Sequence, residues 1–192
     1  ILFLIHADGR FAPAAILPPG AGSLQSIMRA GLGQFPAVRR ALAGYIRDDV
    51  WIYNSVVYRI AARPVIDSGR YVGAIVHGMR VDGNLAQRLG RMLDGAGVVF
   101  FRDNEILAAH FPPGEADTVD PGGASPRDEL AKKLPSLQRD SHLRAGESTD
   151  PVNVTDHHRA VLSLMTGSAG AAGVGYAIVR PVVHLASASG VF

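Results

Sequence analysis

The stretch VVYRIAARPVIDSGRYVGAIVHG, residues 56–78, decides which fold the sequence predicts. Two apolar runs rich in β-branched residues flank Asp67-Ser68-Gly69-Arg70, a composition typical of two antiparallel strands joined by a turn. Each run also carries large polar side chains, among them Arg59 and His77, which a hairpin with a purely structural role does not need. The sequence therefore predicts a β-hairpin that contributes side chains to a site.

Extended and helical patterns alternate on both sides of this hairpin. Alternation of apolar and polar residues predicts strands, and apolar residues three or four positions apart predict helices. The predicted strands are 2–6, 11–17, 50–53, 56–65, 71–81, 98–102, 105–111, 159–166 and 174–183. Four helices are predicted: one that starts at Ser23, one that follows Pro36 with an apolar face that ends at Tyr45, and two that cover 84–93 and 128–138. Met92 lies on the apolar face of the third helix, and Pro135 limits the regularity of the fourth.

The order of these elements occurs twice. Residues 1–82 follow the order strand, turn, strand, helix and antiparallel strands, and residues 96–192 repeat it after a connecting helix at 83–95. The run Ala-Ile-Val at 74–76 recurs at 177–179. The order of elements therefore predicts an α+β chain with two tandem lobes, each containing antiparallel strands and helices.

Composition narrows the class of protein. Of the 192 residues, 47% are hydrophobic and 19% charged, which predicts a globular chain, and no uninterrupted apolar run approaches the roughly 20 residues of a membrane helix. The net charge of +2 is spread among acidic residues, so no nucleic acid is predicted as a partner. The chain has no cysteine, which excludes disulfides and Cys-ligated zinc. Its first residues read as part of a strand, so we expect any signal or membrane anchor to lie outside this sequence.

The spacing of the histidines, glycines and acidic residues does not indicate a catalytic or metal-binding motif. The seven histidines include no helical His-x-x-x-His pair, and adjacent His157 and His158 diverge if they lie on a strand. The run GSAGAAGVG at 167–175 leads into a strand instead of a helix, which favours a hairpin turn over a nucleotide-binding loop. Asp48-Asp49 is interpreted as a pair of solvated charges at a helix end. We predict no enzymatic activity, no cofactor and no metal.

The aromatic and cationic residues around the hairpin form the candidate site. They are Trp51, Tyr53, Tyr58, Arg59 and His77. Alternation places Trp51 and Tyr53 on one face of their strand. Aromatic walls with convergent donors suit a pocket for a small anionic or zwitterionic ligand. The alternative, in which Tyr58 belongs to the core and the arginines face water, agrees equally well with the periodicity.

Three stretches carry a family resemblance: Asp8-Gly9-Arg10 in a first hairpin, PAVRRALAGYIRDDVW at 36–51, and VVYRIAARPVIDSGRYVGAIVHGMRVD at 56–82. Together they resemble the Cache family of extracytoplasmic, PAS-like sensor domains from bacterial chemoreceptors and sensor histidine kinases. The resemblance is best over 1–95. It implies an α+β fold of two tandem lobes, each a PAS-like antiparallel sheet flanked by helices, with the second lobe smaller or degenerate. It also implies a small-molecule pocket between the sheet and a helical cover, a periplasmic location, and a parent protein anchored in the inner membrane outside this sequence, and it leaves a homodimer open.

Two hypotheses of function follow. In the first, the chain is a non-catalytic ligand-sensing input domain that binds a small carboxylate or similar polar metabolite. Arg59 then supplies charge-assisted hydrogen bonds, the aromatic residues form walls, and protonated His77 makes binding tighter at about pH 6 than at about pH 8. In the second, it is a structural or protein-interaction module whose pocket is filled by side chains. A hydrolase or transferase is disfavoured because no nucleophile–base spacing is present.

Overall fold

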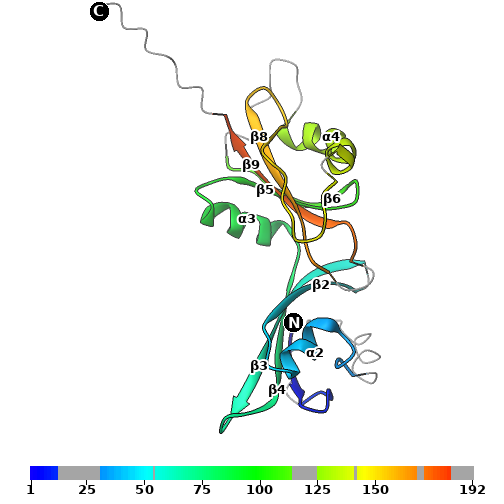
Figure 1. The fold of residues 1–192 in the computed structure, drawn as a ribbon. Helices are drawn as coiled ribbons and strands as arrows, with labels where there is room; N and C mark the ends of the chain where they lie inside the picture. The colour runs from blue at the N-terminus through cyan, green and yellow to red at the C-terminus, as the bar shows by residue number, and fades with distance from the viewer. Residues whose placement is uncertain (13–30, 54, 114–124, 141, 168–170, 183–192) are drawn as a thin grey trace, which may run out of the picture. The chain divides into compact units, whose positions relative to one another are not determined.

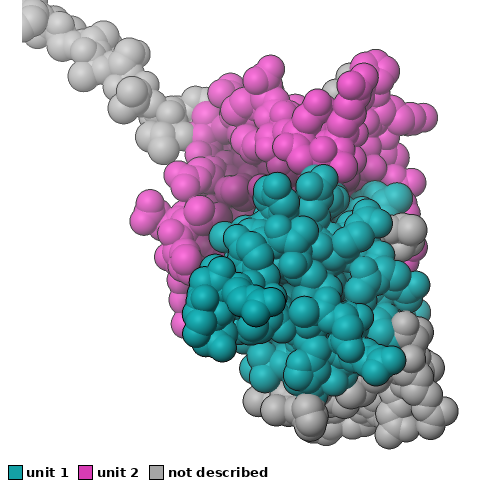
Figure 2. All heavy atoms as spheres, turned by 60° about the horizontal axis from the view of Figure 1, so that its bottom comes forward, with its two compact units in different colours: residues 1–81, 165–174 teal, residues 82–164, 175–192 magenta. Residues whose placement is uncertain are grey.

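The computed structural model describes residues 1–12, 31–53, 55–113, 125–140, 142–167 and 171–182 (Figure 1). These residues group into two compact units, shown in two colours in Figure 2. Unit 1 comprises 1–81 with 165–174, and unit 2 comprises 82–164 with 175–192. The domain boundaries expected from the sequence, 1–82, 83–95 and 96–192, stay a prediction.

Unit 1 contains a four-stranded antiparallel sheet built around the predicted hairpin. The strands are β1 (Leu2–His6), β2 (Arg47–Tyr53), β3 (Val56–Asp67) and β4 (Arg70–Arg80), in the spatial order β1-β4-β3-β2. Ser68 and Gly69 have φ angles of 48° and 77°, so both central turn residues are left-handed, as a two-residue hairpin requires. The hairpin predicted from residues 56–78 is confirmed.

The helix α2 (Pro36–Leu42) covers one face of this sheet. Its Ala37, Val38 and Ala41 are fully buried in one core cluster, together with the apolar residues of β1, β3 and β4. The helix ends at Leu42, and Gly44 follows with a φ of 88°. The prediction that Tyr45 belongs to the apolar face of this helix is wrong, because Tyr45 lies beyond the helix end and is 60% exposed.

Unit 2 contains a second antiparallel sheet, with the order β6-β5-β9-β8-β7. Its strands are β5 (Gly97–Arg102), β6 (Glu105–His110), β7 (Val152–Asn153), β8 (His158–Leu164) and β9 (Val174–Pro181). A strand, instead of a helix, was predicted to follow the glycine-rich run at 167–175. The pairing of β8 with β9 agrees with that prediction, while 168–170 lie outside the described residues.

The helix α3 (Gly83–Met92) begins at Asp82, whose carboxylate accepts a hydrogen bond from the backbone N–H of Leu85. Leu85, Ala86 and Gly90 are buried, as the helical pattern predicts. Met92 was expected on the same apolar face but is 78% exposed. Met92 is seven residues after Leu85 and so lies on the same side of the helix, but it is the last helical residue and the packing that buries Leu85 does not extend to it.

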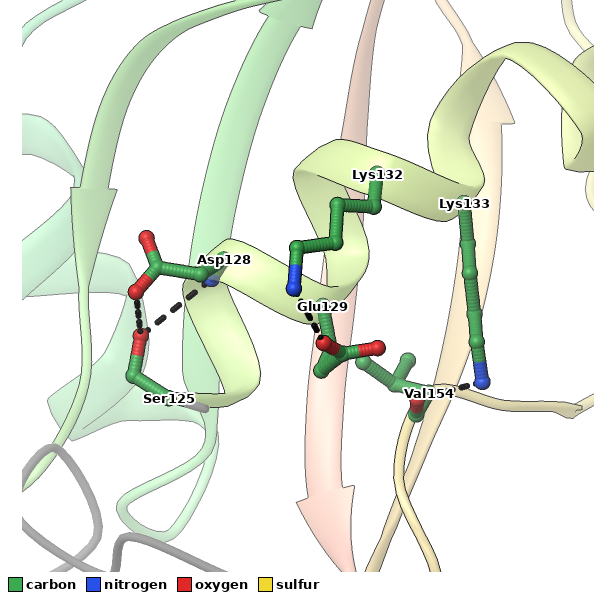
Figure 3. Close-up of polar contacts among 6 residues, drawn as sticks. All are labelled: Ser125, Asp128, Glu129, Lys132, Lys133 and Val154. Carbon is green, nitrogen blue, oxygen red and sulfur yellow. Dashed lines mark hydrogen bonds and ion pairs between the residues drawn. The ribbon is translucent and has the colours of Figure 1, made fainter. Parts of the chain in front are cut away.

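The helix α4 (Pro126–Asp140) packs by Leu130 and Leu134, both fully buried. It continues through Pro135, which was expected to limit its regularity. Polar contacts hold the helix (Figure 3): the Ser125 hydroxyl accepts from the backbone N–H of Asp128, and the Lys133 ammonium donates to the carbonyl of Val154 at 2.7 Å. The carboxylate of Glu129 lies 2.8 Å from the Lys132 ammonium and raises the pKa of that side chain.

The two sheets share one connectivity. In unit 1 the last strand, β4, lies between β1 and β3, and in unit 2 the last strand, β9, lies between β5 and β8. The matching runs at 74–76 and 177–179 fall on these corresponding strands, and Ala74, Val76, Ala177 and Val179 are all buried. The predicted α+β fold with antiparallel sheets flanked by helices is confirmed. Of the predicted strand 11–17 only a bridge between Ile5 and Phe11 is described, and the helix predicted from Ser23 lies outside the described residues.

Candidate functional site

The aromatic residues Trp51, Tyr53 and Tyr58 line one pocket in unit 1. Trp51 and Tyr58 are cross-strand partners on β2 and β3, and Tyr53 lies two residues beyond Trp51, so all three share a face of the sheet. The pocket has a volume of about 50 Å³ and is also lined by apolar side chains, which are Ile1, Phe3, Leu32, Phe35 and Ile52. The three predicted aromatic residues therefore lie together on one side of this pocket.

Packing and a hydrogen bond hold the Trp51 indole in place. The ring of Phe35 lies 4.5 Å from it, centroid to centroid, at an interplanar angle of 35°. On the other side, the indole Nε1–H donates to Oδ2 of Asp49 at 3.1 Å, and Oδ1 of Asp49 accepts from the backbone N–H of Val50 at 2.9 Å. Asp49 is only 2% exposed, so this carboxylate is part of the wall that supports the pocket.

The role of Asp49 corrects the interpretation of Asp48-Asp49 as solvated helix-end charges. Both residues lie within β2, where neighbouring side chains point to opposite faces. Asp49 therefore points to the helix-covered face with Trp51, whereas Asp48 is exposed on the other face. The spacing Asp49-x-Trp51 was the signal available in the sequence, since residues two apart on a strand are neighbours on one face.

Arg59 and His77 lie on the sheet face opposite the pocket. Arg59 follows Tyr58 directly on β3, and alternation turns it to the other side. Its Nη2 lies 3.6 Å from Asp48 Oδ2, and Nη2 of Arg63 lies 2.9 Å from Asp48 Oδ1. His77 is exposed on the same face, across from Ala61. The structure thus brings together three of the five predicted residues and separates them from Arg59 and His77, while the ligand-binding role of all five stays a prediction.

The size of the pocket limits what it can hold as it stands. Pockets that enclose a whole small molecule have volumes of roughly 300–1,000 Å³, and one water molecule needs about 10–15 Å³ of accessible space. A pocket of about 50 Å³ therefore accommodates a small apolar group or a few waters. The phenol groups of Tyr53 and Tyr58 can each donate and accept a hydrogen bond at its edge.

Neither a metal site nor a membrane-spanning helix is present among the described residues. The described residues contain no group of three or more His, Asp or Glu side chains placed to hold a metal ion. His158 is buried, with its Nδ1 3.1 Å from the Thr155 hydroxyl. No described helix is long and apolar enough to span a bilayer.

Comparison with known proteins finds similarity to solved structures only. No family model matches the chain, and no curated protein matches it. The periplasmic domain of Vibrio cholerae LuxQ is 12% identical, with a TM-score of 0.47 over 94% of this chain and 71% of that one. The V. cholerae histidine kinase DctB sensor domain is 14% identical, with a TM-score of 0.41 over 95% and 72%.

A chemoreceptor gives a similar result. The ligand-binding domain of Pseudomonas fluorescens CtaA, solved with L-serine, is 17% identical, with a TM-score of 0.39 over 94% of this chain and 71% of that one. The DctB neighbour is thus a sensor domain of a histidine kinase, and the CtaA neighbour a ligand-binding domain of a chemoreceptor. These are the classes that the sequence resembles. Because the identities are below 25% and the TM-scores below 0.5, the choice of function rests on the residues of the chain itself.

Proposed function

We propose that this chain is a ligand-sensing input domain of a bacterial signal-transduction receptor, and that its ligand binds at the pocket formed by Trp51, Tyr53 and Tyr58. The observation that carries the proposal is the position of these three side chains on the helix-covered face of the first sheet. A surface role for them would leave the rings exposed. Instead they surround a volume that side chains do not fill.

The ligand that suits this lining has a small apolar group beside groups that form hydrogen bonds. The apolar group enters among Phe35, Trp51 and Tyr58, and the polar groups contact the phenol hydroxyls. A small carboxylate paired with Arg59 was the expectation from the sequence, and it stays a prediction. For a pocket ligand, Arg59 on the opposite face is not a direct partner.

Binding of a complete metabolite requires the pocket to enlarge. Phe35 precedes α2 and packs on Trp51, so displacement of Phe35 would open the pocket and move the start of the helix. A ligand that binds only this open arrangement shifts the population toward it by its differential affinity, which is how an input domain transmits a signal. The proposed location is extracytoplasmic, in a parent protein anchored in the inner membrane, and homodimerisation belongs to the same proposal.

The single tryptophan of the chain provides the test. Trp51 is the only tryptophan, so intrinsic fluorescence reports on the pocket directly. The purified chain is titrated with amino acids, small carboxylates and other small metabolites while Trp51 emission and the melting temperature are recorded. A ligand of the pocket changes the emission in a saturable manner and raises the melting temperature at concentrations above its Kd.

Matched variants separate the two faces of the sheet. Tyr58→Leu removes the phenol from the pocket, and we expect it to weaken binding of a hit about tenfold or more. Arg59→Ala and His77→Ala change the opposite face and should leave the affinity at about pH 6 and about pH 8 equal to wild type. Loss of binding in Arg59→Ala with full binding in Tyr58→Leu would place the ligand on the other face. No response to any compound would favour the interaction-module hypothesis.

A further inference from the structure

Exposed apolar side chains gather at one end of the first sheet. Among the described residues six large hydrophobic side chains are exposed, and five of them belong to unit 1. They are Tyr45 (60% exposed), Ile46 (69%), Ile66 (59%), Tyr71 (52%) and Val72 (40%). We call these five residues the hairpin-end patch. Exposed apolar side chains that occur singly need no explanation, whereas a cluster indicates a surface that binds something.

Strand pairing, one ring contact and chain continuity link Tyr45, Ile46, Ile66 and Tyr71 in space, and Val72 follows Tyr71 in the sequence. Ile66 and Tyr71 are cross-strand partners next to the turn between β3 and β4. The ring of Tyr71 lies against Gly44, so close that a Cβ on Gly44 would be 2.5 Å from it. This contact joins the end of the hairpin to Tyr45 and Ile46, which follow Gly44. The patch is therefore one surface made from two segments of the chain.

The end of the hairpin extends beyond its partner strands (Figure 1). β2 pairs with β3 only as far as Ala62, and β1 pairs with β4 only as far as Gly73. Beyond these points the two strands pair with each other through Asp67 and Arg70. An approaching surface can therefore reach the patch without displacing another strand of the described sheet.

Arginines surround the patch. Arg40 lies 5.6 Å from the centre of the Tyr45 ring, Arg47 follows Ile46, and Arg70 precedes Tyr71. All three are exposed, and none forms an ion pair with a described residue. The carboxylate of Asp67 at the turn accepts a hydrogen bond from the Ser68 hydroxyl, and the carboxylate of Asp48 forms ion pairs with Arg59 and Arg63. The patch is apolar with a predominantly positive rim.

We propose that the hairpin-end patch docks a protein partner whose surface presents acidic side chains around an apolar centre. Tyrosine and arginine are enriched among residues that dominate protein interfaces, and a positive rim meets a negative one favourably. A second copy of this chain fits less well, because a two-fold interface would bring the arginine rims together. A bilayer also fits less well, since the polar turn Asp67-Ser68-Gly69-Arg70 would enter the lipid first.

Photo-crosslinking in the native cells tests the proposal. The full-length protein is produced with p-benzoyl-phenylalanine in place of Ile66, and with the same probe in place of Met92 as the matched control. Met92 is 78% exposed in unit 2, so it samples an exposed apolar position outside the patch. We expect the probe at 66, but not at 92, to crosslink to one protein through a peptide that contains acidic residues.

Binding by the purified partner must then depend on charge. We expect Arg47→Glu combined with Arg70→Glu to raise Kd about tenfold or more with an unchanged melting temperature, and wild-type binding to weaken from about 0.05 to about 0.5 M NaCl. Arg102→Glu in unit 2 is the charge control and should keep wild-type affinity. Crosslinks to a second copy of the chain, to lipid only, or to nothing would overturn the proposal. An unchanged Kd of the partner for the Arg47→Glu, Arg70→Glu variant would also overturn it. The ligand response of Trp51 is independent of each of these results.

Discussion

Asp48 and Asp49 show that neighbouring residues of one type can have opposite physical roles. Asp49 is buried and accepts hydrogen bonds from the indole of Trp51 and from the backbone of Val50. Asp48 is about half exposed and forms ion pairs with two arginines that are exposed to a similar degree. The alternation of β2 alone causes the difference, because it turns one carboxylate toward α2 and the other toward water.

Removal of each carboxylate should therefore have different consequences for stability. Asp49→Ala leaves the partly buried indole N–H and the buried N–H of Val50 without this acceptor, and we expect it to lower the free energy of unfolding by about 1–3 kcal/mol. Asp48→Ala removes only exposed ion pairs, for which we expect a loss of about 0–1 kcal/mol. Urea denaturation followed by Trp51 emission measures both. Equal losses in the two variants would contradict the assigned roles.

At the scale of single elements, the end of α2 depends on one glycine. Gly44 has a φ of 88°, which an L-residue adopts only with strain, and its Cα lies under the ring of Tyr71. The helix therefore stops where the chain must both turn and pass beneath the β4 side chain. The same glycine places Tyr45 and Ile46 on the surface instead of on the helix, which is why the helical spacing that included Tyr45 was misleading.

Two glycine substitutions separate backbone strain from the Tyr71 contact. Gly44→Ala and Gly69→Ala both place a side chain at a positive φ, which costs about 1–2 kcal/mol. A Cβ at Gly69 meets nothing within 4 Å, whereas one at Gly44 meets the Tyr71 ring. We expect Gly44→Ala to be the more destabilising in thermal or urea unfolding. Tyr71→Ala in the Gly44→Ala background should recover the difference, and no recovery would argue against the contact.

At the scale of the whole molecule, each compact unit is assembled from separate parts of the chain. The link between β8 and β9, residues 165–173, and the first residue of β9, Val174, belong to unit 1, whereas the rest of both strands belongs to unit 2. Ala171 is 2% exposed there, and Val50 on β2 is equally buried. A Cβ at Gly167 would lie 2.8 Å from the Ala171 Cβ and 3.4 Å from the Val50 Cβ. Gly167 and Ala171 therefore lie against Val50 on the sheet face that α2 does not cover.

A change at Gly167 should accordingly weaken the distant strand β2. We expect Gly167→Val to destabilise unit 1 by about 1–3 kcal/mol through overpacking and to speed amide hydrogen exchange in residues 47–53. Exchange in α4 of unit 2 should change less. Gly83→Val is the control, because a Cβ at Gly83 meets nothing within 4 Å. Uniform acceleration of exchange in both units would contradict the assignment of 165–174 to unit 1.

Local patterns in the sequence were sufficient for most of the described elements, although β7 and the start of β2 at Arg47 were not predicted. β-branched runs, a two-residue turn and helical spacing depend on neighbouring residues, so they predicted the hairpin, the two sheets, the repeated order and the common face of Trp51 and Tyr53. The exact ends of α2 and α3 required the packed structure, because Tyr45 and Met92 fit a helical pattern that tertiary contacts do not use.

The arrangement of side chains across strands depended on the tertiary structure. Alternation shows which residues of one strand share a face. Strand pairing and packing determine which of the two faces α2 covers. Only the folded sheet places Trp51 and Tyr58 opposite each other and puts Arg59 and His77 on the other side. In the same way, burial of Asp49, the positive rim of the hairpin-end patch and the inclusion of 165–174 in unit 1 all arise from contacts between residues far apart in sequence, which no local pattern encodes.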